Sequence, residues 1–198
     1  IAGDGKTIAY IGAGKDCIGL LVFEDKIRPE SAELIRRLKV MKIDHILMLT
    51  GDAPETAKAV AKRLGIKEFF ARLQPDEKLK HIQELAEKRV VMMVGDGIND
   101  APALATARVG VAMGSFGTGV ATDAADVVIT VENVERVADI IRLGRRMTQV
   151  AIQGILFGIG CSVVMMVFAA SGYISPTAGA LLQEVIDLAA ILNAFRAR

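Results

Sequence analysis

The sequence predicts an α/β protein in which a parallel sheet covered by helices is followed by a two-helix membrane hairpin. Two observations support this. Short apolar segments alternate with helix-like segments through the first 146 residues. From Met147 onward the chain is nearly uncharged, with charge only at Glu184, Asp187, Arg196 and Arg198. The first 146 residues therefore carry 22 of the 24 basic and 21 of the 23 acidic residues.

The charged part is predicted to be a doubly covered parallel sheet. Helical spacing or start and stop signals mark residues 29–40, 54–64, 75–88 and 101–107. Apolar runs predict strands at 18–23, 46–49, 69–73, 90–94, 109–113 and 127–130. Strands that are apolar on both faces and alternate with helices are typical of a parallel sheet between helices. Asn133 is expected to cap a long helix that continues into the uncharged tail.

The tail predicts two membrane-spanning helices. Residues 150–174 carry no charge, and residues 177–195 form a second apolar run; about 20 apolar residues span the hydrocarbon. Basic residues flank the outer ends of both runs but not the turn between them. The positive-inside rule then predicts a multi-pass protein of the cell membrane with a cytoplasmic soluble domain. The alternative is a helical hairpin buried in a large soluble core.

Overall charge and the cysteines exclude other classes. The net charge of +1 offers no bulk attraction for nucleic acid. The two cysteines, Cys17 and Cys161, fall in different parts of the chain, which argues against a disulfide scaffold. The chain starts at Ile1 without Met or a signal-like segment, so we expect it to come from the middle of a longer protein.

Polar residues cluster where the predicted strands end, which is where chemistry sits in such sheets. They are Thr50, Gly51 and Asp52 after one strand, Asp96, Gly97, Asn99 and Asp100 after another, and Lys78 at the start of a helix. A hydroxyl and an ammonium suit phosphoryl oxygens, and paired carboxylates suit a hard cation. Glycines let backbone N–H groups approach a phosphate. The cluster therefore predicts a phosphate–magnesium site.

Three motifs make the resemblance specific. They are Thr-Gly-Asp at 50–52, Gln-Pro-Asp-Glu-Lys at 74–78 and Val-Gly-Asp-Gly-Ile-Asn-Asp-Ala-Pro-Ala-Leu at 94–104. The chain resembles the phosphorylation domain of P-type ATPases, which implies a haloacid-dehalogenase-like fold. It is most similar to the heavy-metal class. The implied domains are the end of a nucleotide-binding domain with a return strand (1–23), the phosphorylation domain (24–146) and a transmembrane helix pair (147–198).

The resemblance implies a role for each matching residue, with ATP as substrate and Mg²⁺ as cofactor. Thr50 would hold the phosphoryl group, Lys78 would neutralise its charge, and Asn99 would hydrogen-bond near it. Asp52, beside Gly51, would position the loop and the nucleotide. Asp96 would coordinate magnesium, with Asp100 supporting that metal directly or through water.

The family's nucleophile is not in this sequence. No Asp-Lys-Thr-Gly-Thr run occurs, and Asp-Gly-Lys-Thr at residues 4–7 resembles that motif only superficially. The Thr-Gly-Glu loop of the actuator domain and a Cys-Pro-Cys-type motif are also absent. The resemblance therefore implies the carboxyl-terminal part of a pump that needs a missing amino-terminal part. The chain alone is expected to be inactive.

The second apolar run contains a candidate site for the transported ion. Glu184 and Asp187 are three residues apart, so they share a helix face. Carboxylates inside a membrane are costly and mark functional sites by default. They suit divalent metals of the zinc, cadmium, lead or cobalt kind better than Cu(I). The alternative is a structural hydrogen bond to another helix.

Two other readings of the whole chain stay open. One is a membrane-anchored phosphatase of the same superfamily, which needs an early Asp-x-Asp motif that the sequence does not offer. The other is a non-enzymatic membrane protein whose phosphatase-like domain has lost its activity.

Cys161, Met165 and Met166 are soft-ligand candidates, although Met in an apolar helix usually serves packing.

Overall fold

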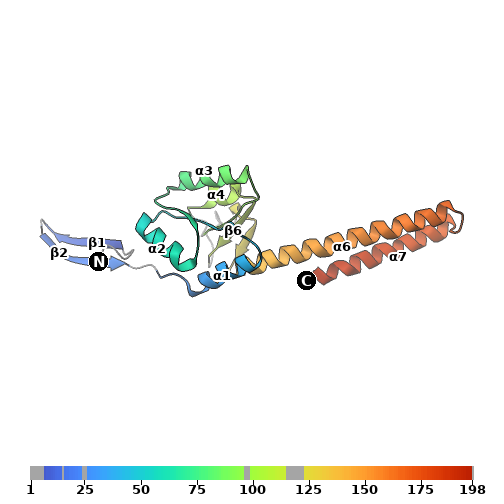
Figure 1. Ribbon diagram of the computed structural model, residues 1–198, viewed down its shortest axis with the longest axis horizontal. Helices are drawn as coiled ribbons and strands as arrows, with labels where there is room; N and C mark the ends of the chain where they lie inside the picture. Colours follow the sequence, from blue (N-terminus) through green and yellow to red (C-terminus); the bar gives the residue numbers. More distant parts are fainter. Residues whose placement is uncertain (1–6, 15, 24–25, 96–98, 115–122, 198) are drawn as a thin grey trace. The chain divides into compact units, whose positions relative to one another are not determined.

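The computed structural model of the chain describes residues 7–14, 16–23, 26–95, 99–114 and 123–197 (Figure 1). The chain divides into two compact units, Ile1–Ala138 and Asp139–Arg198. Asp96, which the sequence predicts as a magnesium ligand, lies outside the described residues.

The first unit begins with an antiparallel hairpin. β1 (Thr7–Ala13) pairs with β2 (Asp16–Phe23), with a register shift between Ile11 and Gly12. The strand predicted at 18–23 is confirmed, but its expected place in the parallel sheet is wrong. An apolar run does not encode strand direction, and here the partner is the strand immediately before it in the chain.

Two parallel ladders follow the hairpin. β3 (Leu47–Leu49) pairs with β4 (Glu68–Phe70). β5 (Met92–Gly95), β6 (Val109–Met113) and β7 (Val127–Ile129) form a second ladder in that order. This confirms the parallel α/β prediction, although the described strands form two ladders rather than one sheet. Among the described residues, β3 and β5 each pair with a neighbouring strand on one side only.

The helices between these strands begin where the sequence signals them. α1 (Pro29–Val40), α2 (Pro54–Leu64), α3 (Pro75–Ala86) and α4 (Ala101–Thr106) each have Pro in the first turn, where a missing N–H has no cost. Gly65 ends α2 in the left-handed conformation, with φ 68. Figure 1 shows α3 and α4 together above β6 and α1 below it.

The core lies between α3, α4 and the second ladder. Ile82, Met93, Ala103, Leu104, Ala107 and Ala112 form one buried cluster, and Leu49 of β3 packs against it. Leu104 is fully buried. α4 approaches β6 so closely that a Cβ on Gly110 would lie 2.5 Å from the carbonyl oxygen of Leu104. Gly110 is therefore required for this contact.

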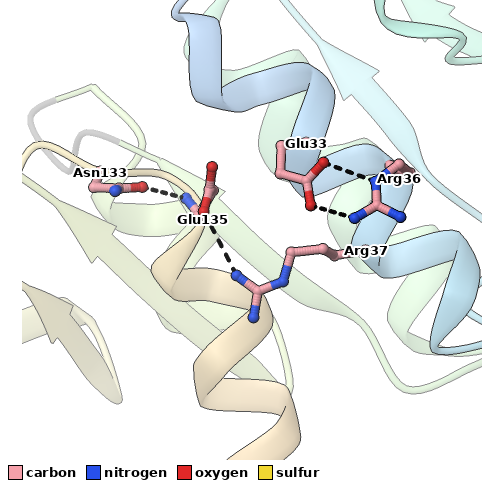
Figure 2. A network of polar contacts seen from close by, with 5 residues as sticks. All are labelled: Glu33, Arg36, Arg37, Asn133 and Glu135. Atoms are coloured by element: carbon pink, nitrogen blue, oxygen red, sulfur yellow. Dashed lines mark hydrogen bonds and ion pairs between the residues drawn. The ribbon is translucent and has the colours of Figure 1, made fainter.

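The turn that leads into α6 (Arg136–Ala170) is joined to α1 by an ion pair. Arg37 Nη1 of α1 lies 3.7 Å from Glu135 Oε2, and Figure 2 shows this ion pair. Asn133 Oδ1 accepts a 2.8 Å hydrogen bond from the backbone N–H of Glu135, so Asn133 caps the turn just before α6. Val137 and Ala138 are buried in the same unit. The predicted long helix is present, but Asn133 caps the turn ahead of it rather than the helix itself, because α6 begins three residues later at Arg136.

The second unit is a pair of apolar helices. Most of α6 and all of α7 (Pro176–Ala194) belong to it, and both are long and apolar enough to cross a membrane. At about 1.5 Å per residue, the 35 residues of α6 exceed the roughly 30 Å hydrocarbon thickness. Neither apolar window is buried in the described part of the chain. That finding disfavours the alternative of a soluble core hairpin.

The two helices contact each other at three levels. At one end, Arg146 Nη2 donates a 2.9 Å hydrogen bond to the backbone oxygen of Arg196, which lies in the 3-10 helix η1 (Phe195–Ala197) directly after α7. A Cβ on Gly154 would lie 3.8 Å from Asn193 Nδ2 farther along. Ser162 and Gln183 are hydrogen-bonded nearer the turn. Ser175 caps α7 by accepting from the N–H of Ala178.

Candidate functional site

The loop after β3 is held by its own side chains. The Thr50 hydroxyl donates a 2.7 Å hydrogen bond to Asp52 Oδ2 and accepts a 3.1 Å bond from the backbone N–H of Asp52. The backbone oxygens of Thr50 and Asp52 accept from the N–H groups of Leu73 and Arg72, at 3.0 and 2.8 Å. The loop therefore bonds to the segment that leads into α3. Asp52 is exposed to solvent.

The second group lies at the carboxyl end of β5. Lys78 Nζ is 2.9 Å from Asp100 Oδ1, and their side chains are 18% and 14% exposed. Lys78 comes from the first turn of α3, where the Glu77 carboxylate accepts a 2.8 Å bond from the N–H of Gln74. The Asp100 backbone oxygen accepts from the N–H of Leu104 at 2.8 Å and so begins α4.

Gly95 makes room for the Asp100 carboxylate. A Cβ on Gly95 would lie 2.8 Å from Asp100 Oδ2 and 3.1 Å from Asp100 Cβ. Such a contact is too short, so a side chain here would displace Asp100 from Lys78. The glycine is therefore needed for close approach rather than for backbone freedom.

The structure places most of the predicted residues but joins only some of them. Thr50 contacts Asp52, and Lys78 contacts Asp100. No hydrogen bond or ion pair between described residues connects these two groups, although Leu49 and Met93 of the preceding strands share one core. Asn99 is exposed beside Asp100.

The chemistry available at this site is phosphate and hard-cation binding. A hydroxyl, an ammonium and carboxylate oxygens are present, and carboxylate oxygen is the ligand type that Mg²⁺ prefers. Among the described residues, no group of three His, Cys, Asp or Glu side chains converges on one point. These residues fit part of a magnesium site but do not form a complete one by themselves.

The structure places two further residues near the Asp187 carboxylate. Gln183 Nε2 donates a 3.0 Å hydrogen bond to Asp187 Oδ1, and Ser162 Oγ of α6 donates a 3.1 Å bond to Gln183 Oε1. Glu184 has no hydrogen bond or ion pair with any residue described. Sequence reasoning did not assign a role to Gln183 or Ser162. The four-residue spacing of Gln183 and Asp187 was the available signal.

Known protein families match the soluble part. A profile described as "haloacid dehalogenase-like hydrolase" matches residues 2–108, and a second profile with the same description matches residues 77–141. The first match covers more than half of the chain. It agrees with the parallel strands, the helices between them and the position of the polar residues.

Three known proteins extend the similarity into the tail. The chain is 41% identical over 180 residues to a manganese-exporting P-type ATPase of Mycobacterium leprae, covering 90% of the chain and 25% of that protein. It is 38% identical over 196 residues to copper-exporting P-type ATPase B of Archaeoglobus fulgidus, covering 96% and 28%. The crystal structure of a zinc-transporting PIB-type ATPase in its E2.Pi state matches 99% of the chain and 32% of its own, with a TM-score of 0.86 and 32% identity.

The chain thus spans about a quarter to a third of the length of these proteins. The structural match covers 99% of the chain, so it extends over both the strand ends and the two apolar helices. The chain belongs to the haloacid dehalogenase-like hydrolase family and is homologous to heavy-metal P-type ATPases.

Proposed function

We propose that this chain is part of an ATP-driven heavy-metal pump that works through an aspartyl-phosphate intermediate and exports a divalent cation. The observation that carries this proposal is the Lys78–Asp100 pair, packed against Gly95 at the carboxyl end of β5. It combines a cation for phosphoryl oxygens with a carboxylate for a hard metal. The homology to metal-exporting ATPases supports the same activity.

The soluble residues would position and neutralise the transferred phosphate, which is most of the protein's work in phosphoryl transfer. Thr50 and the Gly51 backbone would hold the phosphoryl group, Lys78 would neutralise its oxygens, and Asp52 would orient the loop and the nucleotide. The Thr50 hydroxyl has a single proton, which it donates to Asp52 in this structure. It would therefore turn from Asp52 to a phosphoryl oxygen when the phosphoryl group binds.

Mg²⁺ bound here would supply charge neutralisation between ATP and the carboxylates. Asp96 and Asp100 would hold it, and Asn99 would hydrogen-bond near the phosphate. Asp100 Oδ1 contacts Lys78, while its other oxygen makes no hydrogen bond to a described residue. That second oxygen is the one we assign to the metal or its water.

The nucleophilic aspartate would come from a segment outside this chain, because the sequence contains no Asp-Lys-Thr-Gly-Thr run. β3 and β5 each have one side without a ladder in the part described. A further parallel strand bearing the aspartate could pair there, beside Thr50 and Gly95. Residues 1–23, 24–146 and 147–198 would then serve as the end of the nucleotide-binding domain, the phosphorylation domain and a membrane helix pair.

In the membrane, Glu184 and Asp187 would bind the transported cation, with the soluble unit on the cytoplasmic side. Both side chains are exposed on α7 and are available to further helices. Carboxylate ligands favour a divalent metal such as zinc, cadmium, lead or cobalt over Cu(I). The relatives do not decide the metal, since their names specify manganese and copper.

Acid-stable labelling by radioactive ATP tests the proposal. The complete pump should form a phosphoprotein that depends on Mg²⁺, whereas this chain alone should form none. Asp96→Asn in the complete pump should raise the Mg²⁺ concentration needed, because one anionic oxygen ligand is lost.

Labelling of the chain by itself would contradict the assignment of the nucleophile to another segment. Hydrolysis of simple phosphate esters, with no response to transition metals, would instead support the membrane-anchored phosphatase. A protein with neither activity would support the non-enzymatic alternative.

A further inference from the structure

A chain of two hydrogen bonds crosses from α6 to the carboxylate of Asp187. The Ser162 hydroxyl donates to Gln183 Oε1 at 3.1 Å, and Gln183 Nε2 donates to Asp187 Oδ1 at 3.0 Å. Ser162 and Gln183 are half-buried between the two helices, whereas Asp187 is exposed. Gln183 therefore connects the helix interface to a carboxylate that faces away from it.

The Gln183 amide can make both hydrogen bonds in only one orientation. A carboxylate accepts hydrogen bonds and cannot donate them, so the amide nitrogen of Gln183 must face Asp187. The amide oxygen is then left for the Ser162 hydroxyl. In an apolar environment an unpaired amide group is unfavourable, which gives this orientation a strong preference over its flipped form.

The arrangement leaves Asp187 with one engaged oxygen and one free oxygen. Oδ1 accepts from Gln183, while Oδ2 makes no hydrogen bond to a described residue. Gln183 is neutral, so it fixes the carboxylate without cancelling its charge. A cation approaching Asp187 would meet one free, oriented oxygen of a carboxylate that keeps its full negative charge.

We infer that Gln183 is a positioning residue for the transported cation. It holds Asp187 so that the carboxylate binds the metal through Oδ2 alone, and Ser162 in turn holds the Gln183 amide. This inference rests on the proposed role of Asp187 as a metal ligand. One-oxygen coordination suits cations with few ligands, such as four-coordinate Zn²⁺, better than Ca²⁺, which takes six to eight oxygens and often both of a carboxylate.

Gln183→Met in the complete pump tests the inference, because Met keeps the length of the side chain and removes both hydrogen bonds. Partners that orient metal ligands typically contribute 10- to 100-fold in affinity. We therefore expect the Zn²⁺ concentration for half-maximal ATP hydrolysis to rise about tenfold, with the maximal rate nearly unchanged. Gln153→Met is the matched control, since Gln153 is exposed on α6 and outside this chain of bonds; it should change neither quantity.

Ser162→Ala should produce a smaller rise than Gln183→Met, because it removes only the bond that orients the amide. A readout without metal accompanies these assays. In this chain, reconstituted in lipid nanodiscs, Asp187→Ala should speed hydrogen exchange of the Gln183 side-chain amide, measured by NMR. A purely packing role of Gln183 predicts no such change.

The outcomes separate this inference from the proposed function. If Asp187→Ala leaves Zn²⁺ activation intact, Asp187 is not a ligand and the proposed metal site fails. If Asp187→Ala abolishes activation while Gln183→Met leaves the Zn²⁺ dependence unchanged, Asp187 is a ligand and the positioning role of Gln183 is wrong. An equal fall in maximal rate with Gln183→Met and Gln153→Met would also overturn the positioning role.

Discussion

Asp100 in the first unit and Asp187 in the second each accept a hydrogen bond at one carboxylate oxygen, but from different kinds of donor. Each uses Oδ1 for one donor and has no hydrogen bond at Oδ2 from a described residue. Asp100 meets the charged ammonium of Lys78, whereas Asp187 meets the neutral amide of Gln183. A lysine beside a phosphate site can pair with a carboxylate or with phosphoryl oxygens. An amide orients the carboxylate and leaves its charge for an incoming cation.

Asp187→Ala provides the largest expected effect and tests the membrane half of this comparison. It should abolish activation of ATP hydrolysis by zinc-like metals in the complete pump, because the proposed ligand is removed. Phosphorylation by inorganic phosphate should persist, since that reaction uses the soluble site. Glu184→Ala should match it if Glu184 is a second ligand and be milder if it only contacts another helix.

Metal stoichiometry on both variants distinguishes these roles. A ligand variant should lose bound metal, and a packing variant should retain it. Full metal binding and turnover in both variants would show that the pair is structural. Activation by Cu(I) alone in the unmutated pump would contradict the argument from ligand softness.

Lys78→Met tests the soluble half of the comparison. Removing one donor that stabilises transition-state charge typically lowers the rate about 100- to 1,000-fold, and we expect that range for phosphorylation by ATP. Metal bound at the membrane site should be unchanged. Lys80→Met is the control, because Lys80 is exposed on the same helix. Equal phosphorylation rates in the two variants would remove Lys78 from the site.

Gly95→Ala asks whether the position of Asp100 matters as well as its charge. The added methyl group would lie 2.8 Å from Asp100 Oδ2, so the carboxylate must move away from Lys78. Small displacements at a reacting centre cost up to about 100-fold in rate, and we expect a loss of about 10- to 100-fold. Gly114→Ala, at the end of the neighbouring strand β6, meets nothing within 4 Å and should behave as the unmutated pump.

The two regions also differ in how far the sequence predicts them. The bounds of α1 and α2 follow from Pro at the first turn, apolar spacing and, for α2, Gly65 at the end. The motifs likewise selected Lys78 and Asp100 as candidate site residues, and the structure places their side chains 2.9 Å apart. Their pairing depends on how α3 and β5 pack, and no local pattern contains that information.

Other features were missed for identifiable reasons. The strand expected at 69–73 ends at Phe70, because Arg72 adopts a φ of 56 and turns the chain. β2 joins an antiparallel hairpin, since nothing in an apolar run specifies its partner. The hydrogen bonds of Gln183 were not predicted, because one of them is made with Ser162, 21 residues earlier in the chain and on the other helix.

The smallest expected effect concerns the exposed Glu33–Arg36 pair on α1, shown in Figure 2. The hydrogen bonds from Arg36 lower the pKa of the Glu33 carboxyl below its usual value. A carboxyl with a lowered pKa in the folded state adds stability above its unfolded pKa, and that stability is lost as pH falls through the folded pKa. Glu33→Gln should thus lower the thermal midpoint slightly at pH 7 and leave it unchanged in acid below both pKa values. Exposed pairs are screened by salt, so the difference should shrink at high ionic strength.

Glu84→Gln is the control, because Glu84 lies on α3 and its carboxyl has no ion pair with a described residue. A difference in midpoint that persists in acid would show that Glu33 acts through packing rather than charge.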